Sequence, residues 1–377
     1  MRRRPLLLVL AATAALLVGA APARAVTRFG PVVTVLPAPV GCTIDHVDGD
    51  AEISPFGGVV RGFANLSGTG CDQDAIWFFG GRGRSWTFHQ TPYRGQVLAA
   101  GEYSASYVLF SSGTGIHLGK RGVATGGYLT PARQLSATVP GAVRAQGDVL
   151  AGPSHTWWAV WSEQVGPGGE FAQTELFQAK TYGSPDLNRT QVTNHPDNDH
   201  LPRLAFKPGG GAELVFVRDD AFGGGPTHSH LHLATASGNA GAWTGRQFAA
   251  VGLNHGPSVD TTSGPGGHTY VAWVRGQQPF ESDDRSGGGF RHRAFVGSSF
   301  TTGVDSSGGQ VHVTWPRSGG GTVLAERRAG RAWTKATVSG VDSRLNPIVV
   351  SRSGQATVVM ASAARIYART QLPRPGS

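Results

Sequence analysis

The sequence predicts an all-β fold, a single β-propeller with seven blades most favoured, from three observations. An apolar, β-branched and aromatic segment recurs seven times at intervals of roughly 40 to 60 residues, a spacing typical of propeller blades. The chain has 56 Gly, 23 Pro and only 15% charged residues, which indicates short strands joined by tight turns. No window keeps apolar residues at positions i, i+3, i+4 and i+7 for three turns, so we expect almost no helix. The seven segments are Val60–Ala64, Tyr107–Phe110, Trp158–Trp161, Leu214–Arg218, Tyr270–Arg275, Val311–Arg317 and Val358–Ala361.

Each repeat contains more than this central strand. A short strand precedes it and ends in a glycine-rich turn, as in Pro257–Asp260 and Thr302–Asp305, and glycine supplies the positive φ that tight hairpins need. A third strand follows it, and a fourth often carries tryptophan. Four antiparallel strands per repeat make a propeller blade. The expected third strands are Ala75–Gly80, Gly115–Lys120, Glu175–Lys180, His230–Ala236, Phe290–Phe295, Thr322–Arg327 and Arg365–Arg369.

The ends of the chain predict how the ring closes. The last repeat lacks an outer strand, whereas Phe29–Leu36 is a spare strand near the start. Pairing the two would leave no exposed sheet edge, which protects a β fold from aggregation. Blade five is the weak point, because little room for a fourth strand remains between Phe295 and Thr301. A six-bladed ring and an array of β-sandwiches therefore stay open as alternatives.

The first 25 residues predict export. Three arginines, Arg2 to Arg4, precede an apolar stretch from Leu6 to Gly19 and a cleavage site of small residues at Ala23–Ala25. This pattern is typical of a secretory signal peptide. The apolar stretch is too short for a membrane span of about 20 residues. We expect a signal peptide at 1–25, one propeller domain at 26–377, and a secreted, extracellular protein without a membrane span.

Charge and cysteine content narrow the partners. The formal net charge is +9. Removal of residues 1–25, which contain four arginines and no acids, would leave a net charge of 9 − 4 = +5 for the mature chain. This excess is too small to predict nucleic-acid binding. It predicts mild, salt-screened attraction to anionic envelope polymers. The only two cysteines, Cys42 and Cys71, are expected to form a disulfide in an oxidising compartment.

The connections between strands divide the ring into two faces. Turns between first and second strands are short and rich in glycine, whereas the long polar connections emerge on the opposite face. Loops held by a rigid scaffold are where binding usually occurs. We therefore expect the site on the face with long connections, at blades three to six. These connections are Ser162–Gly169, Asn194–Pro202, Asp219–Thr227, Gly276–Gly289 and Val341–Pro347.

Three arginines at matching positions are the sharpest feature of that face. Arg218, Arg275 and Arg317 each end a central strand, in blades four, five and six. Guanidinium groups that converge there would bind a carboxylate, sulfate or phosphate. Alternatively, each arginine pairs with a loop acid and only orders the rim. The loop acids are Asp219, Asp220, Asp283 and Asp284.

Aromatic and metal-ligating residues give further hypotheses. Trp157, Phe222 and Phe280 lie near the long connections and could stack on a sugar ring if exposed. One polar segment could bind a divalent cation through His195, Asp197, Asp199 and His200, although a surface stripe without metal is the alternative. A second acidic segment resembles a calcium loop without the EF-hand spacing, and the alternative is an acidic turn beside the disulfide. Its acids are Asp45, Asp48, Asp50 and Glu52. No cofactor other than calcium is indicated.

With the export signal and the repeats, the chain resembles secreted bacterial propellers of the lectin and sialidase-like type. For sialidases the resemblance implies an arginine triad and Asp-box turns of the form Ser-x-Asp-x-Gly-x-x-Trp. Arg218, Arg275 and Arg317 are similar to the triad, but the segment from Ser306 to Trp315 lacks the aspartate of the Asp box.

The resemblance predicts a non-enzymatic binding propeller for a carbohydrate or cell-envelope polymer. As in some propeller lectins, it could be the targeting subunit of a secreted toxin complex with a protein partner. A sialidase-like glycoside hydrolase or lyase, and a protein–protein interaction scaffold, are the alternatives. No nucleophile elbow, phosphate loop or dinucleotide fingerprint is present.

Overall fold

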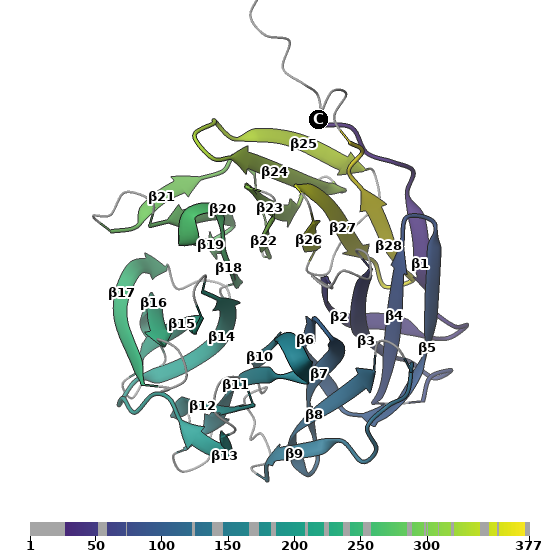
Figure 1. Cartoon of the computed structure of the whole chain (residues 1–377), viewed down its shortest axis with the longest axis horizontal. Helices are drawn as coiled ribbons and strands as arrows, with labels where there is room; N and C mark the ends of the chain where they lie inside the picture. The colour runs from purple at the N-terminus through teal and green to yellow at the C-terminus, as the bar shows by residue number, and fades with distance from the viewer. Residues whose placement is uncertain are drawn as a thin grey trace, which may run out of the picture.

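The chain folds into seven four-stranded antiparallel sheets arranged as blades around a central axis (Figure 1). This computed structural model describes residues 27–51, 59–72, 74–122, 125–137, 146–165, 173–181, 186–207, 210–221, 226–236, 242–251, 258–284, 289–297, 299, 301–307, 309–317, 320–339, 347–352 and 354–373. The predicted seven-bladed propeller is confirmed, and the six-bladed alternative is wrong. The expected signal peptide lies outside the described residues.

The strands follow one another from the inside of each blade to the outside. Blade 1 has β2 (Thr43–Ala51), β3 (Val60–Ser67), β4 (Ala75–Arg82) and β5 (Ser85–Arg94). Blade 2 has β6 (Gln96–Glu102), β7 (Ala105–Ser112), β8 (Gly115–Gly122) and β9 (Arg133–Ser136). Blade 3 has β10 (Gly147–Ala151), β11 (Trp157–Gln164), β12 (Thr174–Lys180) and β13 (Asp186–Gln191), with a 3-10 turn at Pro153–His155.

The remaining blades repeat the same order. Blade 4 has β14 (Asn198–Phe206), β15 (Ala212–Ala221), β16 (Pro226–Ala236) and β17 (Trp243–Val251). Blade 5 has β18 (Val259–Ser263), β19 (Thr269–Arg275), β20 (Gln278–Asp283) and β21 (Arg291–Ala294), with a 3-10 turn at Pro265–Gly267. Blade 6 has β22 (Gly303–Ser307), β23 (Gln310–Pro316), β24 (Thr322–Arg328) and β25 (Thr334–Ser339). Blade 7 has β26 (Ile348–Arg352), β27 (Gln355–Ala361) and β28 (Arg365–Thr370), completed by β1 (Val33–Pro37).

The first strand of the described chain closes the ring, as the sequence predicts. β1 pairs antiparallel with β28, with Val33 opposite Ala368 and Pro37 opposite Arg365. Val35 and Leu36 are buried, so β1 contributes to the core as well as to the sheet. This strand gives blade 7 its fourth strand and leaves β28 without a free edge.

Blade 5 differs from the prediction in strand order. The segment expected as its third strand, Phe290–Phe295, contains the fourth strand β21, and β20 is the third. Gly276, with φ of +61°, allows β19 to turn directly into β20, and Arg275 lies opposite Gln278. The long polar connection expected at Gly276–Gly289 was therefore wrong. β20 escapes a search for apolar segments because four of its six residues, QPFESD, are polar.

The apolar side chains form clusters within and between neighbouring blades. Trp158, Trp161 and Trp315 are almost completely buried, as expected for residues packed between sheets. Their burial follows from the geometry of a propeller, in which both faces of each blade are covered. No helix in the described part of the chain is long and apolar enough to cross a membrane.

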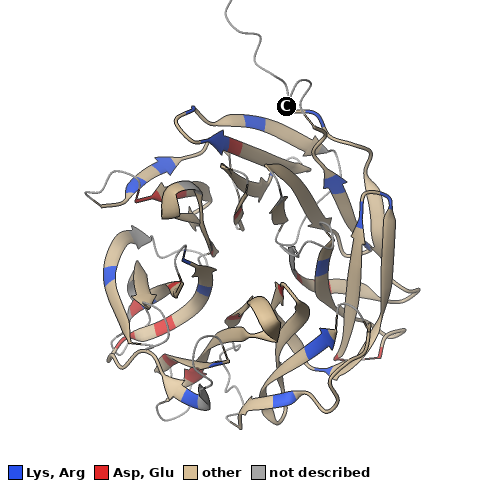
Figure 2. Cartoon of the chain, in the orientation of Figure 1, with Lys and Arg blue, Asp and Glu red and all other residues tan. Residues whose placement is uncertain are grey.

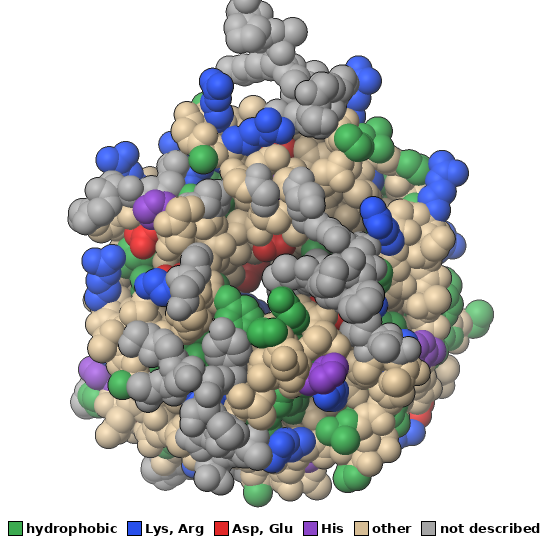
Figure 3. Space-filling model, in the orientation of Figure 1, with side chains coloured by type: hydrophobic (Ala, Val, Ile, Leu, Met, Phe, Trp, Pro, Cys, Tyr) green, Lys and Arg blue, Asp and Glu red, His purple; other side chains and the backbone are tan. Residues whose placement is uncertain are grey.

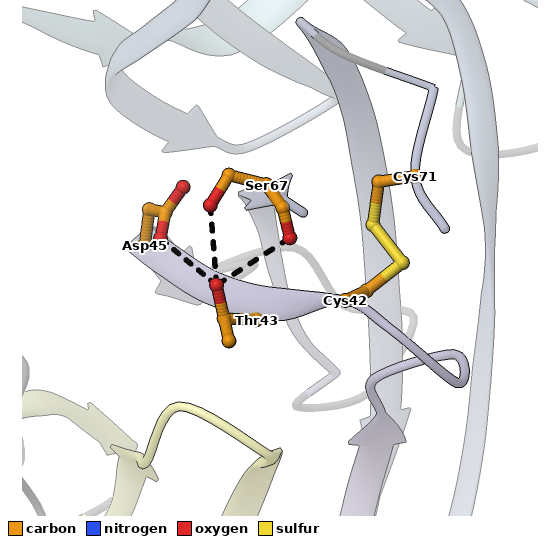
Figure 4. Close-up of a disulfide and its surroundings, with 5 residues drawn as sticks. All are labelled: Cys42, Thr43, Asp45, Ser67 and Cys71. Carbon is orange, nitrogen blue, oxygen red and sulfur yellow. Dashed lines mark hydrogen bonds between the residues drawn. A yellow bond between two sulfur atoms is a disulfide. The ribbon is translucent and has the colours of Figure 1, made fainter. Parts of the chain in front are cut away.

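The strand directions define two faces of the ring. The loop face carries the connections from the second to the third strand of each blade and from the fourth strand to the next blade. The turn face carries the connections from the first to the second strand and from the third to the fourth. The disulfide between Cys42 and Cys71 confirms the predicted pairing and lies on the loop face of blade 1 (Figure 4). It joins the start of β2 to the segment after β3.

Candidate functional site

The first strands of the seven blades surround a central cavity of about 260 Å³. Residues of β2, β6, β10, β14, β18, β22 and β26 line it. Figure 3 shows the ring hollowed at its centre, with acidic side chains on the wall of the hollow. A cavity of this size can hold a ligand as large as a single sugar, or a cluster of water molecules.

Four aspartates on four of these strands line the cavity and bind the next blade. Asp48 accepts a hydrogen bond from the Ala100 backbone N–H at 3.3 Å, and Asp148 accepts one from Leu204 at 2.6 Å. Asp260 accepts a hydrogen bond from the Val304 backbone N–H at 2.7 Å, and Asp305 accepts one from the Ser351 backbone N–H at 2.5 Å. We call Asp48, Asp148, Asp260 and Asp305 the channel aspartates. Each of these hydrogen bonds joins the inner strand of one blade to the next blade in the ring.

The surroundings of the channel aspartates disfavour their charge. Burial raises the pKa of Asp48, Asp260 and Asp305 to about 7, and it also raises the pKa of Asp148. The carboxylates are close enough to repel one another, which adds to the effect for Asp48 and Asp260. These side chains keep partial exposure because they face the cavity, but protein surrounds them on all sides and withholds bulk water.

One cation offsets these acids. Arg203 on β14 lines the same cavity, and its guanidinium donates hydrogen bonds to the carbonyl oxygens of Gly147 at 3.0 Å and Pro202 at 3.1 Å. Its charge lowers the pKa of Asp48, Asp148 and Asp260 relative to what burial alone would produce. Arg203 is therefore the shared counterion of Asp48, Asp148 and Asp260.

Sequence reasoning missed most of this arrangement. It named Asp48 only as part of a calcium-like segment, and it did not single out Asp148, Arg203, Asp260 or Asp305. A signal was present, because a lone aspartate interrupts the short first strand of four repeats. The four strings are His-Val-Asp-Gly, Gly-Asp-Val-Leu, Ser-Val-Asp-Thr and Gly-Val-Asp-Ser. A charged residue that recurs at one position of an inner strand indicates a common role for that position.

Arg218 is held in a buried ion pair on the loop face. Its guanidinium makes two parallel hydrogen bonds with Asp199, both at 2.7 Å, and the Asp199 carboxylate is fully buried. The expected partner, Asp219, instead lies 2.8 Å from His200. Burial alone would raise the pKa of Asp219, but hydrogen bonds from His200 and Ser229 lower it below its ordinary value. Arg218 therefore acts as the counterion of Asp199.

Arg275 and Arg317 occupy a different environment. Both side chains are exposed, at the end of β19 and just beyond β23. No carboxylate of a described residue forms an ion pair with either arginine. The structure thus separates the three arginines into one buried pair and two exposed cations on neighbouring blades.

Asp283 and Asp284 do not lie beside Arg275, as the sequence had led us to expect. They lie at the opposite end of β20, which spans about 17 Å at 3.4 Å per residue, and thus on the turn face. Asp283 is buried against Arg327 at 3.1 Å, and Asp284 accepts a hydrogen bond from the Thr269 backbone N–H at 2.9 Å. The error follows from the unrecognised turn at Gly276.

The candidate sugar platforms are packed against protein. Trp157 is only 5% exposed, and Phe280 stacks on Trp273 with ring centroids 4.4 Å apart. Phe222 lies outside the described residues. The one large aromatic side chain exposed in the described part of the chain is Phe88, at 42%. Stacking on Trp157 or Phe280 would require these packed rings to move.

The candidate metal ligands of blade 4 bind different partners. Asp199 pairs with Arg218, His200 with Asp219, and His195 with Asp197 at 3.0 Å. The described residues contain no group of three or more His, Cys, Asp or Glu side chains arranged to hold a metal ion.

The calcium-like segment of blade 1 forms a strand rather than a loop, because it alternates polar and apolar residues as β2. Asp45 is exposed and accepts a hydrogen bond from Thr43 at 3.4 Å (Figure 4), whereas Asp48 lines the cavity. Asp50 lies in β2 without a described side chain, and Glu52 lies outside the described residues.

Charge is sorted between the inside and the outside of the molecule. Among the described residues, fifteen Lys and Arg side chains are exposed, but only three acidic ones are: Asp45, Asp72 and Asp74, all in blade 1. Figure 2 shows most of the Lys and Arg on the outer strands. The other described acids line the cavity, are buried between strands, or are partly covered near the loops. In the described part of the chain, positive charge therefore predominates among the exposed ionised side chains.

Comparison with known proteins supports the fold without naming a family. The chain matches no protein-family model and no curated protein sequence. It is similar in structure to the BP39L lectin from Burkholderia pseudomallei, with a TM-score of 0.62 at 12% identity over 89% of this chain and 97% of the lectin.

Two enzymes are similar to a comparable extent. Polysaccharide lyase Uly1 has a TM-score of 0.56 at 9% identity, over 88% of this chain and 90% of the lyase. An α-L-arabinanase from Penicillium chrysogenum, solved with arabinobiose, has a TM-score of 0.55 at 12% identity over 91% and 98%. The expected architectural resemblance to lectin and sialidase-like propellers is confirmed. At these identities the similarity establishes the propeller fold alone.

Proposed function

We propose that the protein is a secreted, non-enzymatic propeller that binds an anionic carbohydrate or cell-envelope polymer. The observation that carries this proposal is the sorting of charge, with fifteen exposed cations and three exposed acids among the described residues. A surface of one sign attracts polymers of the other sign, and a polymer can contact several cations at once. The disulfide is in keeping with export, because such bonds persist outside the reducing cytosol.

The engagement of the acids favours binding over catalysis. A glycosidase needs two carboxylates beside the bond that it cleaves. Here the channel aspartates accept backbone hydrogen bonds, and Glu163 binds both Arg189 and the Trp161 indole N–H. Glu175 is similarly held by Thr193 at 2.5 Å and by the His195 backbone N–H at 2.8 Å. Acids that organise the fold in this way are restricted in the movements that proton transfer requires.

Binding to immobilised polysaccharides at two salt concentrations tests the proposal. The set contains a neutral polymer such as dextran, a polyuronate and a poly(glycerol phosphate). We expect binding to the two anionic polymers at about 50 mM salt and a marked loss at about 500 mM, because salt screens exposed charges. Equal signals for neutral and anionic polymers, or no signal at low salt, would contradict the proposal.

A second candidate function is cleavage of a glycosidic bond in the central cavity, by a hydrolase or a lyase reaction. One observation favours it. Asp48, Asp260 and Asp305 have a pKa of about 7, which suits a general acid near neutral pH. Turnover of chromogenic glycosides that decreases above pH 7 and is lost in Asp260→Asn would establish this function. No turnover by the wild-type protein would leave the binding function as the better account.

The possibility of a protein partner belongs to the same proposal. A propeller that targets a secreted complex would carry a second protein at a fixed ratio. Purification from the culture medium, followed by measurement of the mass of the particle, tests this corollary. If the purified protein is a monomer that binds anionic polymer, the hypothesis of a protein partner is wrong and the proposed binding function stands.

A further inference from the structure

The exposed cations are not spread evenly around the ring. Of the fifteen exposed cations in the described residues, seven belong to the neighbouring blades 5 and 6. Arg275 and Arg317 lie on the loop face. The other five are Arg291 and Arg293 on β21, Arg328 at the end of β24, Arg331 in the following turn, and Lys335 on β25. We call these five residues the blade 5–6 patch. Figure 2 shows Lys and Arg on β21 and β25 and at the end of β24, and Figure 3 shows Lys and Arg side chains on the surface of the same part of the ring.

Strand direction places this patch toward the turn face. Arg291 begins β21, Arg328 ends β24, and Arg331 and Lys335 lie at or near the start of β25. All four of these positions adjoin connections between third and fourth strands. The patch is therefore at the outer edge of the ring and on the side opposite Arg275 and Arg317.

The acids of these blades do not neutralise the patch. Glu281 and Asp283 are buried and bind the buried Arg327, at 3.2 and 3.1 Å. Glu326 is buried as well and accepts hydrogen bonds from Gln371 and Thr334. Asp284, at the turn-face end of β20, is partly exposed, but its carboxylate accepts a hydrogen bond from the Thr269 backbone N–H and lies 3.3 Å from His268. The three exposed acids of the described chain are all in blade 1. The positive charge of the patch therefore faces solvent.

The surroundings of the patch favour a polysaccharide over a nucleic acid. Proteins that bind single-stranded nucleic acids present aromatic rings on which bases stack. In the patch the neighbouring rings are packed: Phe295 is 2% exposed and stacks on Trp315 at 4.8 Å, and Trp333 packs edge-on against Phe295. Cations without a stacking platform match a polymer that offers repeated carboxylates or phosphates and no flat bases.

We propose that the blade 5–6 patch is the principal contact site for an anionic polysaccharide or poly(glycerol phosphate), which runs along the outer edge of blades 5 and 6. This inference rests on the proposed function. It places the binding site on the turn face, whereas the sequence led us to expect a site on the loop face. Five cations along one edge of two neighbouring blades can contact several repeat units of a flexible polyanion at once. Both probes share the relevant chemistry, a linear polymer of single negative charges.

Three matched variants test the site. The patch variant carries Arg291→Ser, Arg293→Ser and Arg331→Ser. The control variant carries Arg84→Ser, Arg133→Ser and Arg365→Ser, which are equally exposed residues of blades 1, 2 and 7, so both lose three positive charges. The loop-face variant carries Arg275→Ser and Arg317→Ser. Thermal melts first establish that all three variants fold.

The dissociation constants for polyuronate and poly(glycerol phosphate) are then measured over a range of salt concentrations. We expect the patch variant to bind about tenfold or more weakly than the wild type at low salt. Its slope of log K against log salt should decrease by about two, since each lost contact removes roughly 0.7 for a flexible polyanion. The control variant should bind within about threefold of the wild type.

The other outcomes separate the two proposals. Equal losses in the patch and control variants would mean diffuse attraction and would overturn the site. A loss confined to the loop-face variant would place the site at Arg275 and Arg317, overturning this inference but preserving the proposed function. Absence of binding by the wild type would overturn both. Equal or tighter binding of a single-stranded oligothymidylate would overturn the choice of polysaccharide.

Discussion

Arg218, Arg275 and Arg317 lie in or directly after the second strands of blades 4, 5 and 6 but have different roles. Arg218 neutralises the buried Asp199 through two hydrogen bonds, whereas Arg275 and Arg317 extend into solvent. The position in the repeat determines where the residue lies in its blade, whereas the residue that it binds comes from the neighbouring strand. For Arg218 on β15 this residue is Asp199, directly opposite on β14. Equivalent positions in a repeat protein therefore need not share a function.

Arg218→Ala should reduce the free energy of unfolding by about 3 kcal/mol, because it leaves the Asp199 carboxylate buried without a counterion. Urea denaturation measures the loss. Arg317→Ala, the exposed control, should change the free energy by less than about 0.5 kcal/mol. Adding Asp199→Asn to Arg218→Ala should recover part of the stability. An unchanged midpoint for Arg218→Ala would show that the pair is not a structural counterion pair.

At the scale of elements, pairing between distant strands decides the closure of the ring. β1 pairs with β28, more than 300 residues away, and the Arg369 guanidinium donates to the Gly30 carbonyl oxygen at 2.7 Å beside this junction. The closing strand holds both ends of the described chain in one sheet. Its removal exposes backbone donors and acceptors of β28 that are a template for pairing with another chain.

A chain that begins after Pro37 should therefore aggregate or melt at a lower temperature than the full chain. Size-exclusion chromatography and thermal melts measure both effects. Leu36→Ala provides a gentler test, since loss of this fully buried side chain should cost about 2 to 5 kcal/mol. Val40→Ala is its control, because Val40 is 98% exposed. A truncated chain that remains monomeric with an unchanged melt would argue against closure by β1.

At the scale of the whole molecule, charge is separated by radius. The channel aspartates and Arg203 lie at the centre, and most exposed cations of the described residues lie on the third and fourth strands or in the turns between them. Burial keeps a proton on the channel aspartates at a pH where the unfolded chain has released it. Folding is therefore coupled to proton binding between the unfolded pKa of about 4 and the folded pKa of about 7.

This coupling predicts how stability depends on pH. Because the folded state binds more protons than the unfolded state in this window, the stabilising contributions of Asp48, Asp260 and Asp305 decrease as pH rises from about 4 to about 7. His89 and His117, whose pKa is lowered by burial, act in the opposite direction near pH 6. The informative quantity is thus the difference in slope between a variant and the wild type.

Asp260→Asn should flatten the decrease of melting temperature between pH 5 and pH 8, because asparagine does not titrate. The variant should be destabilised at pH 5, where it loses one of two acceptor oxygens, and less so at pH 8. Asp72→Asn is the control: hydrogen bonds from Arg94 and Gln90 lower the pKa of Asp72, so it stays ionised throughout this range. Parallel melting curves for Asp260→Asn and the wild type would refute the coupling.

The repeat pattern was sufficient for the architecture because it depends on local signals. The seven apolar segments, their glycine turns and the spare strand at Phe29–Leu36 predicted seven blades and ring closure, both of which the structure has. The Cys42–Cys71 pair followed from the cysteine count, since the sequence has only these two, and it is present as well. Backbone sterics and alternation of side chains operate over a few residues, so the sequence alone determines them. The prediction failed at β20, where polar residues form a strand because its neighbours in blade 5 supply the burial.

Only the tertiary structure decided which charged groups meet. The pairing of Arg218 with Asp199, the burial of Asp283 against Arg327, and the gathering of four aspartates around one cavity all depend on contacts between strands or blades. Coulomb energies and desolvation are set by distance and burial in three dimensions, and sequence spacing contains neither. The sequence thus determined the ring, whereas the packing of its blades determined where its charges lie and which of them remain available to a ligand.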